Sequence, residues 1–217
     1  MNCDVISTGS TGNAVVLNGE ILLDCGVPYK RIAPHADGLR LVLCTHRHGD
    51  HLNPATVRRL HQEHPLIRFG CCWWMVPHLL HAGVAVRCID VYEPDQTYAY
   101  DGGLFVQVFP LVHDVENCGY KIWINNQSAL YATDTANMDG VTAPGFDLYM
   151  IEANHTEQEL ADRIARKEAA GEFCYEYRAQ ASHLSREAAD FWLAQNAGPN
   201  SRVVYLHQHT ERNSNNA

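Results

Sequence analysis

Short apolar runs alternate with clusters of turn residues along most of this chain, a pattern typical of strands in a mixed fold. Asn18-Gly19 separates two of these runs and is a strong signal for a two-residue hairpin. Asp101-Gly102 and Asn125-Asn126 predict two turns within a meander. The predicted strands are Cys3 to Ser7, Ala14 to Leu17, Glu20 to Asp24, Leu39 to Cys44, Thr97 to Tyr100, Leu104 to Pro110, Tyr120 to Ile124, Ala129 to Ala132 and Val203 to Leu206.

Helical patterns lie between these runs. Pro54 to His61 follows Asn53, which predicts an N-cap residue with proline at the first helical position. Val76 to His81 has an apolar side, and Arg186 to Asn196 begins after Ser185, another candidate N-cap. Strands and helices that alternate in this way predict an α/β fold.

The composition fits one globular unit. At 217 residues and 46% hydrophobic content, the chain can bury a sizeable core without disulfides. We expect residues 1–210 to form a single domain and residues 211–217 to be a polar C-terminal tail. The eight cysteines are scattered without a C-x-x-C pair, so free and mostly buried thiols are expected. No leader pattern and no apolar stretch of membrane-spanning length is present, which predicts a cytoplasmic location.

The formal net charge of -9 argues against broad, nonspecific attraction to a phosphate backbone. Within Arg163 to Arg178 the arginines are offset by glutamates, so this segment is predicted to be a mixed-charge helix with a loop rather than a basic arm. Any nucleic-acid binding would therefore depend on local contacts and on bound divalent cations.

The segment Thr45 to His51, with the sequence THRHGDH, concentrates metal-ligating chemistry directly after an apolar run. In an extended chain, His46 and His48 point to the same side and can hold one ion. Asp50 and His51 follow where the chain must turn toward the helix at Pro54. One short loop therefore carries enough ligands to begin a two-metal site.

Three more residues of this kind each follow a predicted strand: His113, Asp134 and His207. Ligands in open sheets bind at strand ends, so several loops are expected to converge on one site. His209 competes with His207 for the last position, but His207 comes directly after the apolar run. We therefore predict His207 as the ligand and His209 as a surface histidine.

With these residues the sequence resembles the metallo-β-lactamase fold superfamily, over essentially the whole chain. The resemblance implies a four-layer αββα sandwich, with helices outside two facing sheets and two divalent metals at one edge. It also implies a ligand set. The first metal would be held by His46, His48 and His113, the second by Asp50, His51 and His207, and Asp134 would bridge them. Zinc suits the imidazole-rich set, while manganese or iron are compatible with it.

Two further segments narrow the resemblance to one branch of the superfamily. Glu152, in IEANH, and His183, in SHLS, match a pair in ribonuclease Z and its relatives, where the glutamate orients a histidine that protonates the leaving oxygen of a phosphodiester. Together with the opening glycine-rich segment Ser7 to Asn13, these features are most similar to the YycJ/WalJ-like exonucleases. The long arm with which ribonuclease Z grips tRNA has no clear counterpart here.

The resemblance implies a binuclear metal-dependent hydrolase that cleaves phosphodiesters, most similar to a DNA exonuclease. Two metals about 3.5 to 4 Å apart can lower the pKa of a shared water and hold the resulting hydroxide in line with phosphorus. The departing alkoxide still needs a proton, and His183, oriented by Glu152, is the candidate acid. The predicted catalytic residues are Asp50, Glu152 and His183.

Alternative functions remain open at the level of sequence. A cyclic-nucleotide phosphodiesterase is not separable from a nuclease, and the acidic charge favours the smaller substrate. A thioesterase of glyoxalase II type or a β-lactam hydrolase would use the same metals without His183. A non-catalytic metal-binding protein would require missing ligands. The expected partner is a nucleic acid or nucleotide phosphodiester and not a membrane, and the sequence leaves the oligomeric state open, a homodimer included.

Overall fold

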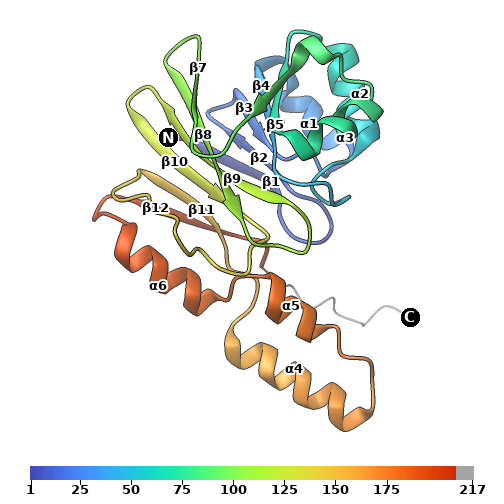
Figure 1. Ribbon diagram of the computed structural model, residues 1–217, viewed down its shortest axis with the longest axis vertical. Helices are drawn as coiled ribbons and strands as arrows, with labels where there is room; N and C mark the ends of the chain where they lie inside the picture. The colour runs from blue at the N-terminus through green and yellow to red at the C-terminus, as the bar shows by residue number, and fades with distance from the viewer. Residues whose placement is uncertain (209–217) are drawn as a thin grey trace.

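Two six-stranded sheets form the centre of the structure, a computed structural model that describes residues 1–208. The first sheet contains β1 (Cys3–Ser7), β2 (Ala14–Leu17), β3 (Ile21–Leu23), β4 (Leu41–Cys44), β5 (Arg68–Cys72) and β6 (Ile89–Tyr92), in that order. The second contains β12 (Arg202–Leu206), β11 (Leu148–Glu152), β10 (Gln127–Ala132), β9 (Asn117–Ile124), β8 (Leu104–Leu111) and β7 (Thr97–Tyr100), in that order. Each half of the chain therefore builds one sheet (Figure 1).

Strand direction brings several strand ends to one edge. In the first sheet β3, β4, β5 and β6 are parallel, so their carboxyl ends point the same way. In the second sheet β10, β11 and β12 are parallel. Because β9 is antiparallel to both β8 and β10, β8 runs in their direction too. The loops that follow these strands can therefore meet at a common edge.

The two sheets pack face to face, and alternation along the strands sorts their side chains. Leu41 and Leu43 of β4 face the second sheet, where they join a core with Val106 and Ile122. Val42 of β4 points the other way, into the core beneath the first three helices. The interface between the sheets is therefore a continuous apolar layer.

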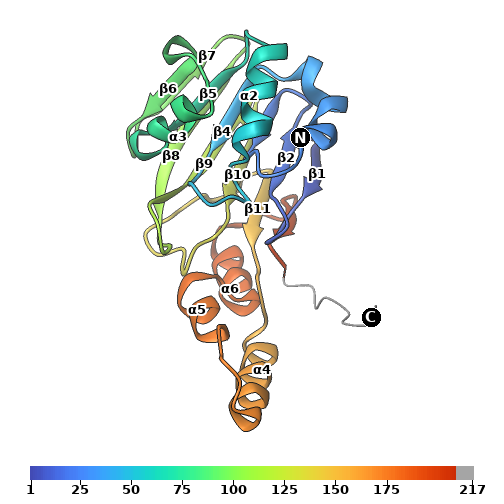
Figure 2. The same cartoon turned by 90° about the vertical axis from the view of Figure 1, so that its right-hand side faces the viewer.

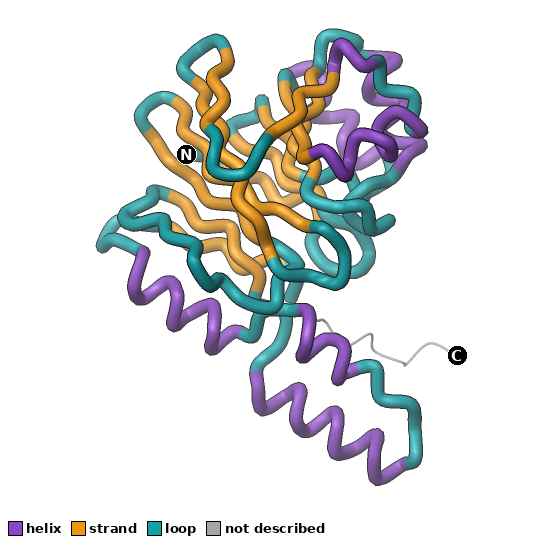
Figure 3. The backbone as a smooth tube through the Cα atoms, in the orientation of Figure 1, coloured by secondary structure: helices purple, strands orange, loops and turns teal. Residues whose placement is uncertain are grey.

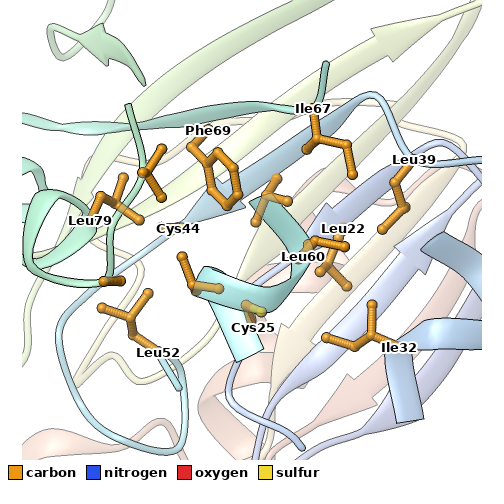
Figure 4. Close-up of a cluster of buried hydrophobic side chains, with 14 of the residues drawn as sticks. Leu22, Cys25, Ile32, Leu39, Cys44, Leu52, Leu60, Ile67, Phe69 and Leu79 are labelled. Carbon is orange, nitrogen blue, oxygen red and sulfur yellow. The ribbon is translucent and has the colours of Figure 1, made fainter. Parts of the chain in front are cut away.

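Helices cover the outer face of each sheet. α1 (Tyr29–Ile32), α2 (Pro54–Glu63) and α3 (Val76–His81) lie on the first sheet, where Leu60 and Leu79 pack with Phe69. Figure 4 shows this cluster. α6 (Arg186–Asn196) covers the second sheet through Trp192 and Leu193. Short 3-10 turns occupy Ala33–Gly38, Trp73–Met75 and Val86–Cys88. The expected four-layer sandwich is confirmed.

Two helices leave this body. α4 (Glu157–Ala170) and α5 (Glu176–Ser182) form a projection that extends beyond the sheets, as Figures 1 and 2 show. Thr156 and Glu159 begin α4 with a capping box, and Gly171 ends it in a left-handed conformation at φ 65°. The predicted mixed-charge helix with a loop is thus two helices, because Gly171 terminates the first.

Most of the predicted elements are present, and so are the three predicted turns, the one at Asp101-Gly102 lying between β7 and β8. Asn18 and Gly19 have φ values of 51° and 74°, and Asn125 and Asn126 have values of 51° and 60°. The sequence interpretation missed β5, β6, β11 and α1. The three strands are short and their runs lack the alternation that reveals a half-buried strand, while α1 is only four residues long. Figure 3 shows where strands and helices lie along the backbone.

All eight cysteines are free thiols, as expected, and six of them are buried. Among residues 1–208, no helix combines the length and the apolar character needed to cross a bilayer. The predicted tail at residues 211–217 lies outside the described residues, and so does His209.

Candidate metal centre

The loop after β4 gathers its histidines closely. Nε2 of His46 lies 3.2 Å from Nδ1 of His48, and the rings of His46 and His51 are 4.1 Å apart. The amide of His51 donates to the carbonyl of His48 at 2.9 Å, which closes the turn. Asn53 then caps α2 by accepting two backbone N–H groups, as predicted. The loop is therefore held between a buried strand and a capped helix.

Asp24, at the end of β3, supports this loop from below and is fully buried. Its carboxylate accepts hydrogen bonds from Nδ1 of His51 at 2.8 Å, from both donors of Thr45, and from the Tyr131 hydroxyl at 2.9 Å. The bond to His51 fixes the ring so that Nε2 faces the centre. The sequence interpretation gave Asp24 no role, although it follows an apolar strand just as Asp134 does.

The glycine-rich turn near the start of the chain packs against the same loop. The backbone N–H of Asn13 donates to the Asp50 carbonyl at 2.6 Å, and the side-chain Nδ2 of Asn13 lies 2.8 Å from Nε2 of His51. Gly26 also passes close by, since a Cβ there would lie 1.8 Å from the Asp50 carbonyl oxygen. Only glycine fits this contact. Backbone packing thus fixes where Asp50 and His51 stand.

Asp134, which follows β10, connects the two halves of the centre. One carboxylate oxygen lies 3.5 Å from Nε2 of His46, 3.1 Å from Nε2 of His51 and 3.8 Å from Nε2 of His113. The other oxygen lies 2.9 Å from Nδ1 of His207. The residues that follow separate strands therefore converge, as the sequence predicted.

The donor atoms fall into groups with metal-binding spacing. His46, His48, His113 and Asp134 offer ligand atoms that all lie within 4.8 Å of one another, and so do Asp50, His51 and Asp134. The Ser182 carbonyl, 3.0 Å from Nδ1 of His113, accepts its proton and turns Nε2 inward. Asp134 belongs to both groups, which suits a bridging carboxylate.

His207 joins the centre from the other side. Its Nδ1 lies 2.9 Å from a carboxylate oxygen of Asp134 and 2.9 Å from one of Glu152. Burial disfavours the charged ring, but these two carboxylates outweigh it and raise the pKa of His207 to about 10. His207 therefore forms a group with Asp134, Glu152 and His183, and does not share the group of Asp50 and His51.

The remaining electrostatics follow from burial and close neighbours. Burial and the adjacent His51 hold the pKa of His46 well below its ordinary value. For His51 burial acts in the same direction, but Asp134 and Asp24 outweigh it and raise its pKa well above the usual range. Burial works against a charged Asp134, yet His51 and His207 hold its pKa well below normal. The centre thus pairs anionic carboxylates with imidazoles.

Glu152 and His183, which the sequence paired only by resemblance, are in contact. Oε1 of Glu152 lies 2.7 Å from Nδ1 of His183, and Oε2 accepts hydrogen bonds from the amides of Thr135 and Leu184. Burial raises the pKa of Glu152, but the bonds from His183 and His207 more than compensate, and its pKa lies below normal. The His183 ring lies 5.3 Å from that of His113.

Asp114, which lies beside the centre, was missed by sequence reasoning. Oδ1 of Asp114 lies 3.2 Å from Nε2 of His113 and 3.4 Å from Nε2 of His48. Asp114 also forms an ion pair with Arg178 of α5, which ties the projection to the centre. The only sequence signal was that Asp114 adjoins a predicted ligand.

Three polar residues at strand ends adopt a left-handed backbone. Asp24, Asp134 and His207 have φ values of 57°, 55° and 53°. Aspartate and histidine are among the non-glycine residues that enter this region most readily. The turn out of each strand redirects the chain at the point where the side chain enters the centre.

The residues present fit a divalent metal. Imidazole nitrogens and carboxylate oxygens are the ligands that zinc and similar ions take, and the spacing of their atoms lets one ion contact several of them. The supporting hydrogen bonds to His51 and His113 are those that ligating histidines usually make.

Known proteins resemble this chain in sequence and in fold. The chain resembles the "Exodeoxyribonuclease YycJ" of Bacillus anthracis at 23% identity over 175 residues, covering 74% of this chain and 65% of that protein. It therefore spans slightly less than two thirds of that relative's length. Its fold is similar to that of the metallo-beta-lactamase fold protein YhfI from Bacillus subtilis, with a TM-score of 0.72 and 15% identity over 98% of this chain and 88% of that one.

Human tRNase Z, short form, has a TM-score of 0.68 and 17% identity over 96% of this chain and 93% of its own. A diphosphatase from the PhnP family has a TM-score of 0.64 and 15% identity over 95% and 85%. At these identities the likeness is one of fold. The model of the beta-lactamase superfamily domain matches residues 20–208. This chain therefore belongs to the beta-lactamase superfamily.

Proposed function

We propose that this hydrolase is a metal-dependent phosphodiesterase, and within that class a nuclease that resembles a DNA exonuclease. The observation that carries the proposal is the contact between Glu152 and His183 beside a histidine and carboxylate cluster. A metal centre alone would serve many hydrolases. A buried carboxylate that orients a partly exposed histidine adds a proton donor, which a departing alkoxide requires.

In this proposal two divalent cations, zinc or else manganese or iron, occupy the centre. His46, His48, His113 and Asp134 would hold one, and Asp50, His51 and Asp134 would hold the other. The sequence assigned His207 to this second ion; its ring contacts the shared Asp134, so it would reach that ion only from the side of Glu152 and His183. When bound, these ions lower the pKa of water and neutralise charge on the phosphoryl oxygens. Asp50 keeps a quarter of its side chain exposed, so it can also orient the attacking water.

His183 and Glu152 act on the leaving group. Glu152 accepts the Nδ1 proton of His183, which fixes the ring and leaves Nε2 as the atom that can donate a proton to the leaving oxygen. The bond between phosphorus and the leaving oxygen breaks as that oxygen takes this proton. The amides of Thr135 and Leu184 hold Glu152 in place.

The relatives support a phosphate ester as substrate. They include an exodeoxyribonuclease, a tRNase and a diphosphatase. The net charge of -9 favours short or small substrates over long polyanions, so a cyclic-nucleotide phosphodiesterase stays as the alternative. The cytoplasmic location expected from the sequence remains part of the proposal.

The test compares leaving groups. Metal-loaded protein is assayed with end-labelled DNA and RNA, cyclic nucleotides, a thioester, and a nucleotide p-nitrophenyl ester. His183→Ala should lower kcat on nucleoside leaving groups by about 10²–10⁴-fold, and much less on p-nitrophenolate, which leaves without a proton. His48→Ala should abolish both activities.

His81→Ala is the matched control, because His81 is an exposed histidine of α3. Thioester turnover that is indifferent to His183→Ala, without diester cleavage, would contradict the proposal. So would equal losses on both kinds of leaving group.

A further inference from the structure

A cavity of about 460 Å³ lies where the projection joins the body. Residues of α4 and α5 line it together with Ala136, His155, Ser185 and Ala188. In Figure 2 α4 lies lowest in the view, and α5 lies above it, beside the lower part of α6. Its volume is within the range of about 300–1,000 Å³ that is usual for small-molecule sites. The catalytic roles proposed above do not use this space.

His183 connects the cavity to the metal centre. It lines the cavity, and its ring lies 4.9 Å from that of His207 and 5.3 Å from that of His113. Its Nδ1 is bound to Glu152, so Nε2 is the atom left to meet a substrate. A group attached to the oxygen that His183 protonates would therefore extend into this cavity.

The lining is apolar and acidic. Leu160, Ile164 and Ala165 of α4 form an apolar wall. The charged residues that line the cavity are Glu157 and Glu168, and within residues 1–208 no lysine or arginine is among them. Away from His183, a phosphate would meet these two carboxylates and no lysine or arginine of the described lining, which is unfavourable.

Polar groups for a neutral ligand are also present. Gln180 brings a side-chain amide to the wall. His155 is buried, and its Nδ1 lies 3.2 Å from Oδ1 of Asn154. Burial and the field of Arg163 keep the pKa of His155 below normal, so the ring is neutral. An amide and a neutral imidazole can hydrogen-bond the edge of a heterocyclic base while apolar side chains contact its face.

We propose that this cavity binds the leaving side of the substrate and accepts an uncharged nucleoside there in preference to a strand with further phosphates. The inference rests on the function proposed above and deepens it. Water attacks phosphorus, the bond from phosphorus to the nucleoside oxygen breaks, and the proton of His183 goes to that oxygen. The enzyme would thus release one terminal nucleoside from an unphosphorylated end, with the phosphate left on the retained strand, or cleave small diesters.

The first test changes only the charge of the substrate. Metal-loaded protein is given dTpdT, pdTpdT and dTpdTp, and chromatography of the products identifies the nucleoside that leaves. We expect kcat/KM to fall about tenfold when that nucleoside carries the added phosphate, and to change less when the retained one does. Glu168→Gln should narrow the difference.

Equal kcat/KM for the three substrates would overturn the inference. Cleavage of long single-stranded DNA without cleavage of any of the three would also overturn it. If metal-loaded protein cleaves no diester at all, the proposed function itself fails, so the two failures are distinguishable.

The second test fills the cavity. Two substrates are compared: dTpdT, from which a nucleoside leaves, and the methyl ester of the retained nucleotide, from which only methanol leaves. Ala165→Trp should lower kcat/KM for dTpdT, relative to kcat/KM for the methyl ester, by about tenfold. Ala169→Trp is the matched control, because Ala169 lies on α4 outside the lining. An unchanged ratio in Ala165→Trp protein with normal metal content would contradict the inference.

Discussion

The two sheets supply the centre in different ways. The first sheet contributes His46, His48, Asp50 and His51 from one short loop after β4. The second contributes single residues from several strand ends, and these meet only when β8, β10, β11 and β12 are aligned. One half of the site is therefore local in sequence, while the other half exists only as tertiary structure.

The largest expected effect comes from the residue at which the halves meet. Asp134→Asn removes a carboxylate that contacts His46, His51, His113 and His207. We expect the variant to bind fewer than two metal ions per chain. Its loss of kcat/KM should exceed roughly 100-fold, the loss typical when a residue that only hydrogen-bonds to a metal ligand is replaced. Elemental analysis and diester kinetics measure both.

Asp139→Asn is the control for this prediction, because Asp139 is exposed and close in sequence. If Asp134→Asn protein keeps two tightly bound ions, the two halves do not depend on a shared carboxylate.

A smaller effect is expected within the local half. Asp24→Asn replaces the carboxylate that fixes the ring of His51. Outer partners of this kind change metal affinity by roughly 10–100-fold, and we expect a loss in that range. Titration against a chromophoric chelator measures it, and an affinity equal to that of the unaltered protein would show that the loop holds His51 without Asp24.

The same contrast explains what the sequence could predict. His46 to His51 were identified because their spacing alone fixes which side chains share a loop. The strand-end rule identified His113, Asp134 and His207. Asp24 also follows an apolar strand, but it was given no role, and neither were Asn13 and Asp114, because their local sequence does not say which residues they face. The fold class followed from alternating patterns, whereas β5, β6 and β11 lack such a pattern.

The hydroxyl of Tyr131 links the halves in a different way, since it donates from β10 to Asp24 of the first sheet. Tyr131→Phe leaves the buried carboxylate with one donor fewer, and we expect the free energy of unfolding to fall by about 1–3 kcal/mol. Denaturant titration at fixed metal concentration measures it. Tyr175→Phe, on the exposed projection, should stay within about 0.5 kcal/mol, and equal losses in both variants would contradict the prediction.

The smallest effect is expected in the projection, which belongs to the second half alone. Burial raises the pKa of Glu176, but Lys167, whose Nζ lies 2.9 Å away, more than offsets this, so its pKa lies below normal. Because the pKa is lower in the folded state, Glu176 stabilises the fold when the pH is above the ordinary glutamate pKa of about 4.3. This stabilisation is lost as the pH falls through the folded-state pKa.

Glu176→Gln should abolish the part of the stability that is lost on acidification, and should speed amide exchange in α4 and α5. The metal content should stay unchanged. Hydrogen exchange at neutral and acidic pH checks this. Faster exchange in β4 and β10 as well would show that the projection and the centre are energetically coupled.

The left-handed backbone at Asp24, Asp134 and His207 has a consequence for laboratory evolution. Glycine enters that region without the penalty that a Cβ brings, so it would relieve local strain at all three positions. Glycine would also leave the buried partners of these side chains unsatisfied, so a screen that rewards heat resistance alone sets a relaxed backbone against lost hydrogen bonds. A screen that also demands turnover should retain both aspartates and the histidine. The residues recovered at these three positions with and without selection for turnover therefore separate the demands of stability from those of catalysis.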